Sequence, residues 1–377
     1  MRKATAKSSW RSAPPLLPLF ALPLFLCAFA APRAEAAAQA AQVRVAVDAA
    51  FDIARAPLCL AIKKGWFEAE KIEVTIIESR GSGSRLSAVA GARADIAWAT
   101  AAEILSERAR AMKLKIVGAL GDLHPACVFF LADTGISSPG DLAGKRIAVR
   151  PLSIETVLLP LMAEKSGIRI EDLILVPLDP AAAIAALASG SVQAMLGSLE
   201  ELAILERAFA PASLGHILWA VHGFDIYGEC YVARDAAVTG NSAKSLAAFL
   251  GVIYKAWEYS LSNPEEAAAA AAELLLVEPE IVSQGLARWV ELYATDAYRT
   301  LGIGSIDRAR IAETMHATAT LLGSAITFRT EDAYNGALLP SPPVRMKEKE
   351  PEAAAPTGPA TVPAALAPAG PPAQPAP

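Results

Sequence analysis

Strand-like and helix-like segments alternate between about residues 42 and 340, and this alternation limits the fold more than any other feature. The apolar runs VRVAV (Val43–Val47), VTIIE (Val74–Glu78) and DIAWA (Asp95–Ala99) are separated by helical patterns such as PLCLAIKKGWFEAE (Pro57–Glu70). Such alternation is typical of a mostly parallel sheet covered by helices. The sequence therefore predicts an α/β protein.

The alternation starts again in the second half of this region. Two stretches are alike, Ala88–Thr100 (AVAGARADIAWAT) and Ala186–Ser198 (ALASGSVQAMLGS). Each contains the end of a small-residue helix, a glycine, an apolar strand and a final hydroxyl residue. A glutamate three residues later, Glu103 or Glu201, completes a capping box for the next helix. These features predict two similar α/β lobes.

After about Asp235 the chain is almost wholly helical, and we expect these helices to pack back on the first lobe. The first lobe is then discontinuous, with residues 42–130 and 232–340, and the second lobe takes residues 131–231.

Both ends of the chain are predicted to lie outside the folded lobes. Residues 1–36 combine a basic start, a short apolar run (Leu16–Ala31) and the small residues AEA, which is typical of a secretory signal peptide. The apolar run is shorter than the ~20 residues that span a bilayer. From Ser341 to the end at residue 377 proline and alanine dominate, which predicts a disordered tail.

Charge and cysteine content narrow the class of protein. The net charge of −5 disfavours a nucleic-acid partner. Three cysteines follow the signal, Cys59, Cys127 and Cys230, and an odd number leaves at least one thiol unpaired. A bridge between Cys127 and Cys230 and two separate buried thiols both remain open.

The sequence contains no catalytic motif that we can name. H-E-x-x-H, C-x-x-C and G-x-S-x-G are absent, and GSGSRL has leucine where a dinucleotide fingerprint needs its last glycine. The four histidines lack the spacing of a helical zinc site. We therefore predict a binding protein rather than an enzyme, with no cofactor and no metal.

The stretch GSGS offers binding chemistry at the start of a predicted helix. Gly81 and Gly83 allow a ligand to approach the main chain, and Ser82 and Ser84 supply hydroxyl groups. The first N–H groups of the helix point to the same place and favour an anionic or strongly polar group. The plain alternative is an ordinary helix-capping turn.

Further candidates occupy the predicted carboxyl ends of strands, where open α/β sheets bind ligands. Trp98 can equally be a core residue, Thr100 a helix cap, and Asp52 or Glu229 a solvated charge. The candidates outside the GSGS stretch are Phe51, Asp52, Trp98, Thr100, Ser153, Glu200, Tyr227 and Glu229.

Six segments in this order resemble the solute-binding proteins of ABC importers, in the branch that binds nitrate, sulfonates, taurine and thiamine-pyrimidine precursors. The segments are APLCLAIKKGWFEAEKIEVTII (56–77), RGSGSRLSAVAGARADIAWAT (80–100), GISSPGDLAGKRIAV (135–149), GFDIYGECYVARD (223–235), GIGSIDRARI (302–311) and AYNGALLP (333–340).

The resemblance implies a two-lobe periplasmic-binding-protein fold, type II-like, in which two α/β sheets are joined by two crossing segments. It implies a periplasmic monomer that closes on a small polar organic ligand and delivers it to a membrane permease. The first lobe would present Phe51, Asp52, Gly81–Ser84, Trp98 and Thr100 to the ligand, and the second Ser153, Glu200 and Tyr227.

One departure from these relatives concerns the ligand. They often have asparagine where this chain has Glu229, and a carboxylate fits a cationic or heterocyclic amine better than an anion. The cysteine cluster and catalytic histidine of relatives that make the thiamine pyrimidine are absent, so that activity is not carried over. An exported enzyme on this scaffold and a ligand-sensing module for a membrane receptor remain alternatives.

Overall fold

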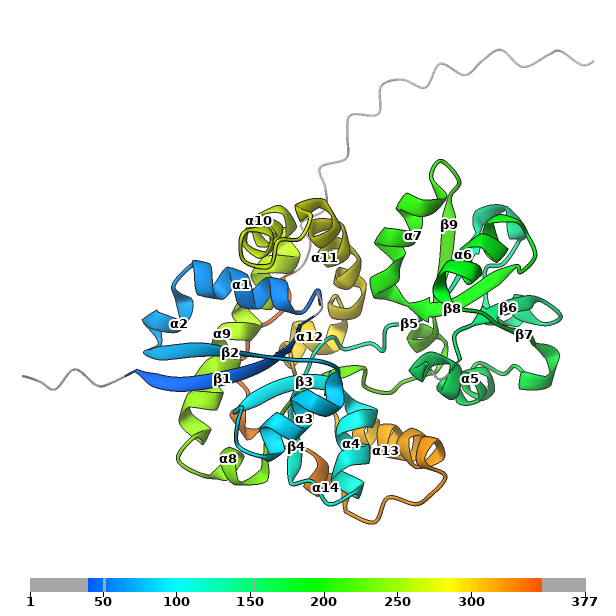
Figure 1. Cartoon of the computed structure of the whole chain (residues 1–377). Coiled ribbons are helices and arrows are strands. Elements are labelled where there is room, and N and C mark those ends of the chain that lie inside the picture. Colours follow the sequence, from blue (N-terminus) through cyan, green and yellow to red (C-terminus); the bar gives the residue numbers. More distant parts are fainter. Residues whose placement is uncertain (1–39, 50–51, 152, 348–377) are drawn as a thin grey trace, which may run out of the picture. The chain divides into compact units, whose positions relative to one another are not determined.

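The computed structural model describes residues 40–49, 52–151 and 153–347. The predicted signal at 1–36, Phe51 and the tail from residue 348 lie outside these ranges. The described chain forms two five-stranded sheets with helices packed on them (Figure 1).

The first sheet has the strand order β2-β1-β3-β10-β4. Its strands are β1 (Ala41–Asp48), β2 (Ile72–Ser79), β3 (Ile96–Thr100), β4 (Leu114–Ala119) and β10 (Glu229–Arg234). Strand β1 runs parallel to β2 and β3, whereas β10 runs antiparallel to β3 and β4. The sheet is therefore mixed. The chain leaves the first sheet at the carboxyl end of β4 and returns to it at the same end. Strand β10 therefore runs in the opposite direction to β4.

The second sheet repeats this arrangement with the order β7-β6-β8-β5-β9. Its strands are β5 (Ala126–Leu131), β6 (Arg146–Val149), β7 (Ile174–Pro177), β8 (Ala194–Ser198) and β9 (Leu214–Leu218). Strand β5 is the antiparallel one. The two similar stretches supply β3 and β8, which hold equivalent places in the two sheets. The expectation of two α/β sheets joined by two crossings is confirmed.

The strands correct the predicted lobe boundaries. The boundary between residues 130 and 131 falls inside β5, and the boundary between 231 and 232 falls inside β10. Each of these strands pairs within one sheet, so the chain passes between the sheets at residues 120–125 and 219–228. We call these segments the first and second crossings.

Helices follow most of the strands, as the alternation predicts. Those between the strands are α1 (Arg55–Lys63), α2 (Trp66–Ala69), α3 (Ser82–Ala90), α4 (Ala101–Ala109), α5 (Ile154–Lys165), α6 (Pro180–Ala188) and α7 (Leu202–Phe209). One predicted helix, Pro57–Glu70, is wrong as a single element, because Gly65 has φ of 66° and separates α1 from α2. A left-handed residue cannot continue a helix, and glycine adopts this conformation without steric cost.

The helices after β10 are α8 (Asp235–Thr239), α9 (Ala243–Ser262), α10 (Pro264–Leu275), α11 (Pro279–Tyr293), α12 (Asp296–Thr300), α13 (Arg308–Leu322) and α14 (Thr330–Ala333). Helices α9 and α10 pack against α1, as expected for helices that return to the first sheet. Helix α11 contacts α7 as well, and α13 contacts α5, so these two helices also touch elements of the second sheet.

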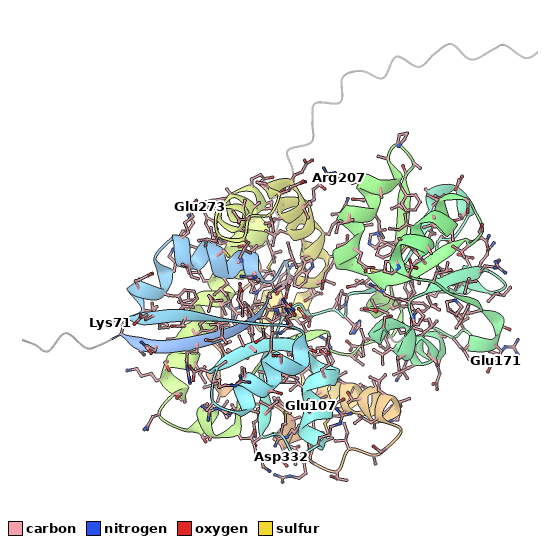
Figure 2. All side chains as sticks on the ribbon, viewed as in Figure 1. Lys71, Glu107, Glu171, Arg207, Glu273 and Asp332 are labelled. Atoms are coloured by element: carbon pink, nitrogen blue, oxygen red, sulfur yellow. The ribbon has the colours of Figure 1, made fainter. Side chains whose placement is uncertain are left out.

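Apolar side chains fill the space between sheets and helices, while charged ones such as Lys71, Glu171 and Glu273 point outward (Figure 2). Trp257 and Trp289 stack in this core with ring centroids 5.0 Å apart. Within the described ranges, none of the helices has both the length and the apolar character needed to cross a membrane.

Two further expectations can be compared with the structure. Cys59, Cys127 and Cys230 are all buried free thiols, so the alternative of a bridge is wrong. Burial raises the pKa of the Cys59 thiol to about 11, which keeps it protonated at neutral pH.

The predicted start of the disordered tail at Ser341 is also wrong. Residues 341–347 are held on α12, where Met346 N–H donates to the Tyr298 carbonyl at 3.3 Å.

Candidate functional site

The GSGS stretch forms the start of α3. Gly81 precedes the helix with φ of 73°, and its N–H donates to Asp48 Oδ2 at 3.0 Å. Apart from the adjacent residues and the backbone of α3 itself, no described atom lies within 4 Å of the place that a Cβ would take at Gly81 or Gly83. The positive φ explains Gly81 without a ligand, but Gly83 is helical. The open space beside Gly83 therefore leaves room for a ligand at this corner.

A buried arginine holds this corner against the sheet. Arg85 pairs with Asp48 at the end of β1, at 2.6 Å, and its Nε donates to the Trp98 carbonyl of β3 at 3.0 Å. The sequence analysis missed both Asp48 and Arg85. The only indication of Asp48 in the sequence was its position directly after the predicted strand Val43–Val47.

The capping box predicted from Thr100 and Glu103 is present at the start of α4. The Glu103 carboxylate accepts hydrogen bonds from the Thr100 N–H and hydroxyl, at 3.1 and 2.8 Å, and also from the Ser82 hydroxyl. The hydroxyls of Thr100 and Ser82 are therefore already engaged in hydrogen bonds within the protein. Ser84 is exposed and lies one turn of backbone from Gly81.

Two of the three aromatic candidates, Trp98 and Tyr227, are buried, and the third, Phe51, lies outside the described ranges. Trp98 is only 1% exposed and its indole N–H donates to Asp52 Oδ2 at 2.6 Å. Tyr227 is 2% exposed and its hydroxyl accepts from the Asp307 N–H at 2.7 Å. Trp98 lies on a central strand and Tyr227 packs toward α13, so neither ring can stack on a ligand. Trp98 instead orients a carboxylate.

Three predicted carboxyl groups from distant parts of the chain interact electrostatically. We call Asp52, Glu200 and Glu229 the acidic trio. Asp52 follows β1, and Glu229 opens β10 opposite Thr100. Glu200 comes from the second sheet, in the 3-10 turn Leu199–Glu201 after β8.

The environments of Glu200 and Glu229 disfavour negative charge. Desolvation, followed by the charges of Asp52 and Glu200, raises the pKa of Glu229 well above its usual range, although Arg85 opposes the shift. Desolvation and the charge of Asp52 raise the pKa of Glu200 to about 8. Glu200 is nevertheless exposed to solvent. Water therefore reaches the Glu200 carboxyl group.

An arriving cation would relieve this repulsion. A positive group near Glu200 and Glu229 stabilises their ionised forms and lowers the pKa values of these two side chains. The acidic trio therefore suits a protonated nitrogen or a donor-rich heterocycle better than a sulfonate or nitrate.

Ser153 belongs to the other side of the candidate site. Its hydroxyl accepts from the Thr156 N–H at 3.2 Å and caps α5. Glu155, two residues later, contributes to the raised pKa of Glu200, so the start of α5 lies within electrostatic range of that residue.

The described residues contain no group of three or more histidine, cysteine, aspartate or glutamate side chains arranged to hold a metal ion. His124, in the first crossing, is buried and accepts from the Ala126 N–H through Nδ1 at 3.1 Å. Desolvation lowers its pKa to about 4, so the ring is neutral at physiological pH.

Solved structures of similar fold are periplasmic binding proteins. The periplasmic aliphatic sulphonate binding protein SsuA from Escherichia coli has a TM-score of 0.62 at 16% identity, over 82% of this chain and 95% of that one. A periplasmic sulfonate-binding protein SsuA from Methylobacillus flagellatus has a TM-score of 0.59 at 13% identity, over 80% and 93%. At this identity the likeness concerns the fold, and the predicted fold class is confirmed.

Sequence relatives point to the same group of proteins. The formylaminopyrimidine-binding protein of Halalkalibacterium halodurans is 23% identical over 212 residues, which cover 56% of this chain and 63% of that protein. A Haemophilus influenzae protein whose name refers to thiamine biosynthesis is 26% identical over 213 residues, or 56% and 67%. The chain thus spans about two thirds of these relatives. The profile described as NMT1/THI5 like matches residues 53–267, more than half of the chain. This chain belongs to the NMT1/THI5-like family.

Proposed function

We propose that this protein is a periplasmic solute-binding protein that captures a small, amine-bearing organic ligand for ABC-type import. The acidic trio carries the proposal, because carboxyl groups of both sheets influence one another electrostatically and Glu200 is exposed to solvent. The relatives support the transport class, since they include a binding protein for a pyrimidine and structural neighbours that bind sulfonates in the periplasm. Of these two ligand types, the pyrimidine agrees better with three carboxyl groups.

The proposed mechanism is closure of the two sheets on the ligand about the two crossings. A protonated nitrogen would contact Asp52 and Glu229 from the first sheet and Glu200 from the second. Because its attraction to both sides is strongest when they are close, the ligand would stabilise the closed state. The open corner at Gly83 and the first N–H groups of α3 would accept a polar group elsewhere on the ligand.

Delivery to a membrane permease follows from this class of protein. The predicted signal at residues 1–36 would export the chain, and the mature protein would act as a periplasmic monomer. Its role would be recognition and release, without a chemical step.

Calorimetry on the chain that lacks residues 1–36 tests the ligand class. We expect binding of aminopyrimidines or arylalkylamines and none of alkanesulfonates. Glu229→Gln should weaken amine binding by about tenfold or more, because a hydrogen bond to a charged group contributes about 1.5–3 kcal/mol. Glu164→Gln is the matched control, since Glu164 is exposed on α5. Tighter binding of a sulfonate than of any amine would refute the proposed class.

A further inference from the structure

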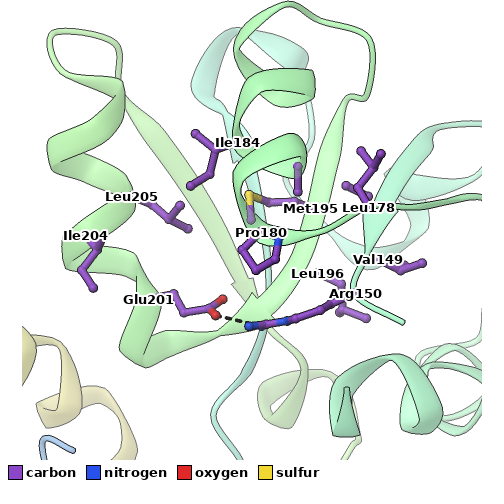
Figure 3. A pocket seen from close by; sticks show the side chains of 12 residues that line it. Val149, Arg150, Leu178, Pro180, Ile184, Met195, Leu196, Glu201, Ile204 and Leu205 are labelled. Carbon is purple, nitrogen blue, oxygen red and sulfur yellow. Dashed lines mark hydrogen bonds and ion pairs between the residues drawn. The ribbon is translucent and has the colours of Figure 1, made fainter. Parts of the chain in front are cut away.

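A recess lies within the part of the chain that forms the second sheet. It is a cavity of about 170 Å³ between α6 and α7, over β6 and β8 (Figure 3). Its walls are mostly aliphatic, and Ile184 of α6 and Leu205 of α7 extend toward each other across it. Val149 and Met195 contribute from the strands.

The sequence of α6 explains why the space is not filled. This helix reads PAAAIAALA, and besides Ile184 it lines the cavity only with Pro180 at its start and with Ala183, which offers a methyl group. In the first sheet the equivalent helices α3 and α4 meet directly, since the Ser82 hydroxyl donates to Glu103. Helices α6 and α7 have no such bond among the described contacts.

The charges at the cavity are already neutralised. Arg150 and Glu201 form an ion pair of 2.8 Å along one wall, and their side chains are 35% and 31% exposed. An entering anion would have to displace Glu201 from Arg150, and a cation would have to displace Arg150. An apolar group can enter without separating this ion pair. Its binding therefore avoids the free-energy cost of leaving a charge unpaired.

The cavity lies at the carboxyl ends of β6 and β8, the same end of the second sheet as Glu200. Val149 ends β6, and Glu201 directly follows Glu200 in the turn after β8. Ile204, at the rim, is 56% exposed, so solvent reaches the entrance. A single ligand can therefore place a polar end near Glu200 and an apolar end in the cavity.

We infer that this cavity is a binding subsite for an apolar group of about the size of a benzene ring. An apolar protein cavity of about 150 Å³ binds benzene, and this one is of similar volume. The identity of the whole ligand rests on the proposed function: the captured amine would carry an aryl or branched alkyl group. The subsite would then select among amines by the size of that group.

The test compares two substitutions on one helix. Ala183→Phe fills the cavity, whereas Ala185→Phe adds the same ring at an exposed position of α6. Toluene, followed by ligand-observed NMR, should bind saturably to the wild type and to Ala185→Phe but not to Ala183→Phe. Phenethylamine should bind about tenfold or more tightly than ethylamine, because burying an apolar side-chain-sized group contributes about 1.5–3 kcal/mol. This ratio should fall to about one in Ala183→Phe.

Thermal unfolding checks that each variant is folded. If Ala183→Phe does not fold, Ile204→Asp serves instead, since an exposed position tolerates the change and a carboxylate at the rim opposes an apolar ligand. Equal toluene binding by wild type and a cavity variant, or no saturable binding by folded wild type, would overturn the inference. Toluene binding together with failure of every amine would support the subsite and contradict the amine class proposed above.

Discussion

Glu200 and Glu229 show how surroundings decide the chemistry of a residue. Each is an ordinary glutamate in the sequence, in a turn or at a strand end. In the structure, desolvation and neighbouring carboxylates raise the pKa of both side chains. The same carboxyl groups on an exposed helix would be permanently ionised and would select nothing.

The raised pKa of Glu200 has a consequence for stability. Its folded-state value of about 8 exceeds its ordinary value of 4.5. Below pH 4.5 both the folded and the unfolded chain hold the proton. Between pH 4.5 and 8 the unfolded chain releases it first, so the free energy of unfolding falls as the pH rises.

We therefore expect Glu200→Gln to flatten the pH dependence of unfolding. The variant should match the wild type near pH 4 and exceed its stability at pH 8. Solvent contact at Glu200 will reduce the size of the difference. Urea unfolding at a series of pH values measures it, with Glu164→Gln as the control. Parallel curves for wild type and Glu200→Gln would contradict the assigned environment.

At the scale of elements, local sequence predicted much of what the structure contains. The capping box at Thr100 begins α4, and the corresponding box at Ser198 lies after β8. Strand β9 was missed because its sequence, LGHIL, contains glycine and histidine and occupies a partly buried edge of the sheet. Elements with strong local sequence patterns were predictable. The edge strand β9 has a weak pattern of its own, and it forms by pairing with β5.

The cap of α4 can be tested by a substitution at one residue. Thr100→Ala removes the hydroxyl that accepts from the Glu103 N–H at 3.2 Å. We expect it to lower the free energy of unfolding by about 1–2 kcal/mol, whereas Thr100→Ser should retain most of the stability. Urea unfolding of both variants checks this. If the alanine variant were as stable as the serine variant, the cap would contribute nothing.

At the scale of the whole molecule, one side chain ties the two crossings together. Arg310 of α13 donates to the Asp122 carbonyl of the first crossing at 2.7 Å and lies 2.6 Å from Asp225 Oδ1 of the second. Its guanidinium also lies over the Tyr227 ring, 5.1 Å from the centroid. Both passages between the sheets are thereby attached to the same helix.

Replacing Arg310 by methionine should be severely destabilising. Asp122 is only 4% exposed, and its carboxylate forms an ion pair with the Arg310 guanidinium. Removing Arg310 leaves this charge buried and unpaired, which costs about 3–5 kcal/mol. Adding Asp122→Asn to Arg310→Met should recover part of this loss, because the unpaired charge disappears. Urea unfolding of the single and double variants measures the coupling. No recovery in the double variant would show that Arg310 acts through packing alone.

Local sequence was enough to predict most of the strands and helices, the start of α3 at a glycine-serine turn and the cap of α4. Each of these depends on residues within a few positions of one another, so it is readable from local pattern. Only the tertiary structure shows that Trp98 and Tyr227 turn inward, that β5 and β10 run antiparallel, and that Asp52, Glu200 and Glu229 lie within electrostatic range of one another. These outcomes depend on contacts and charge interactions between residues far apart in the chain, which a local sequence pattern does not reveal.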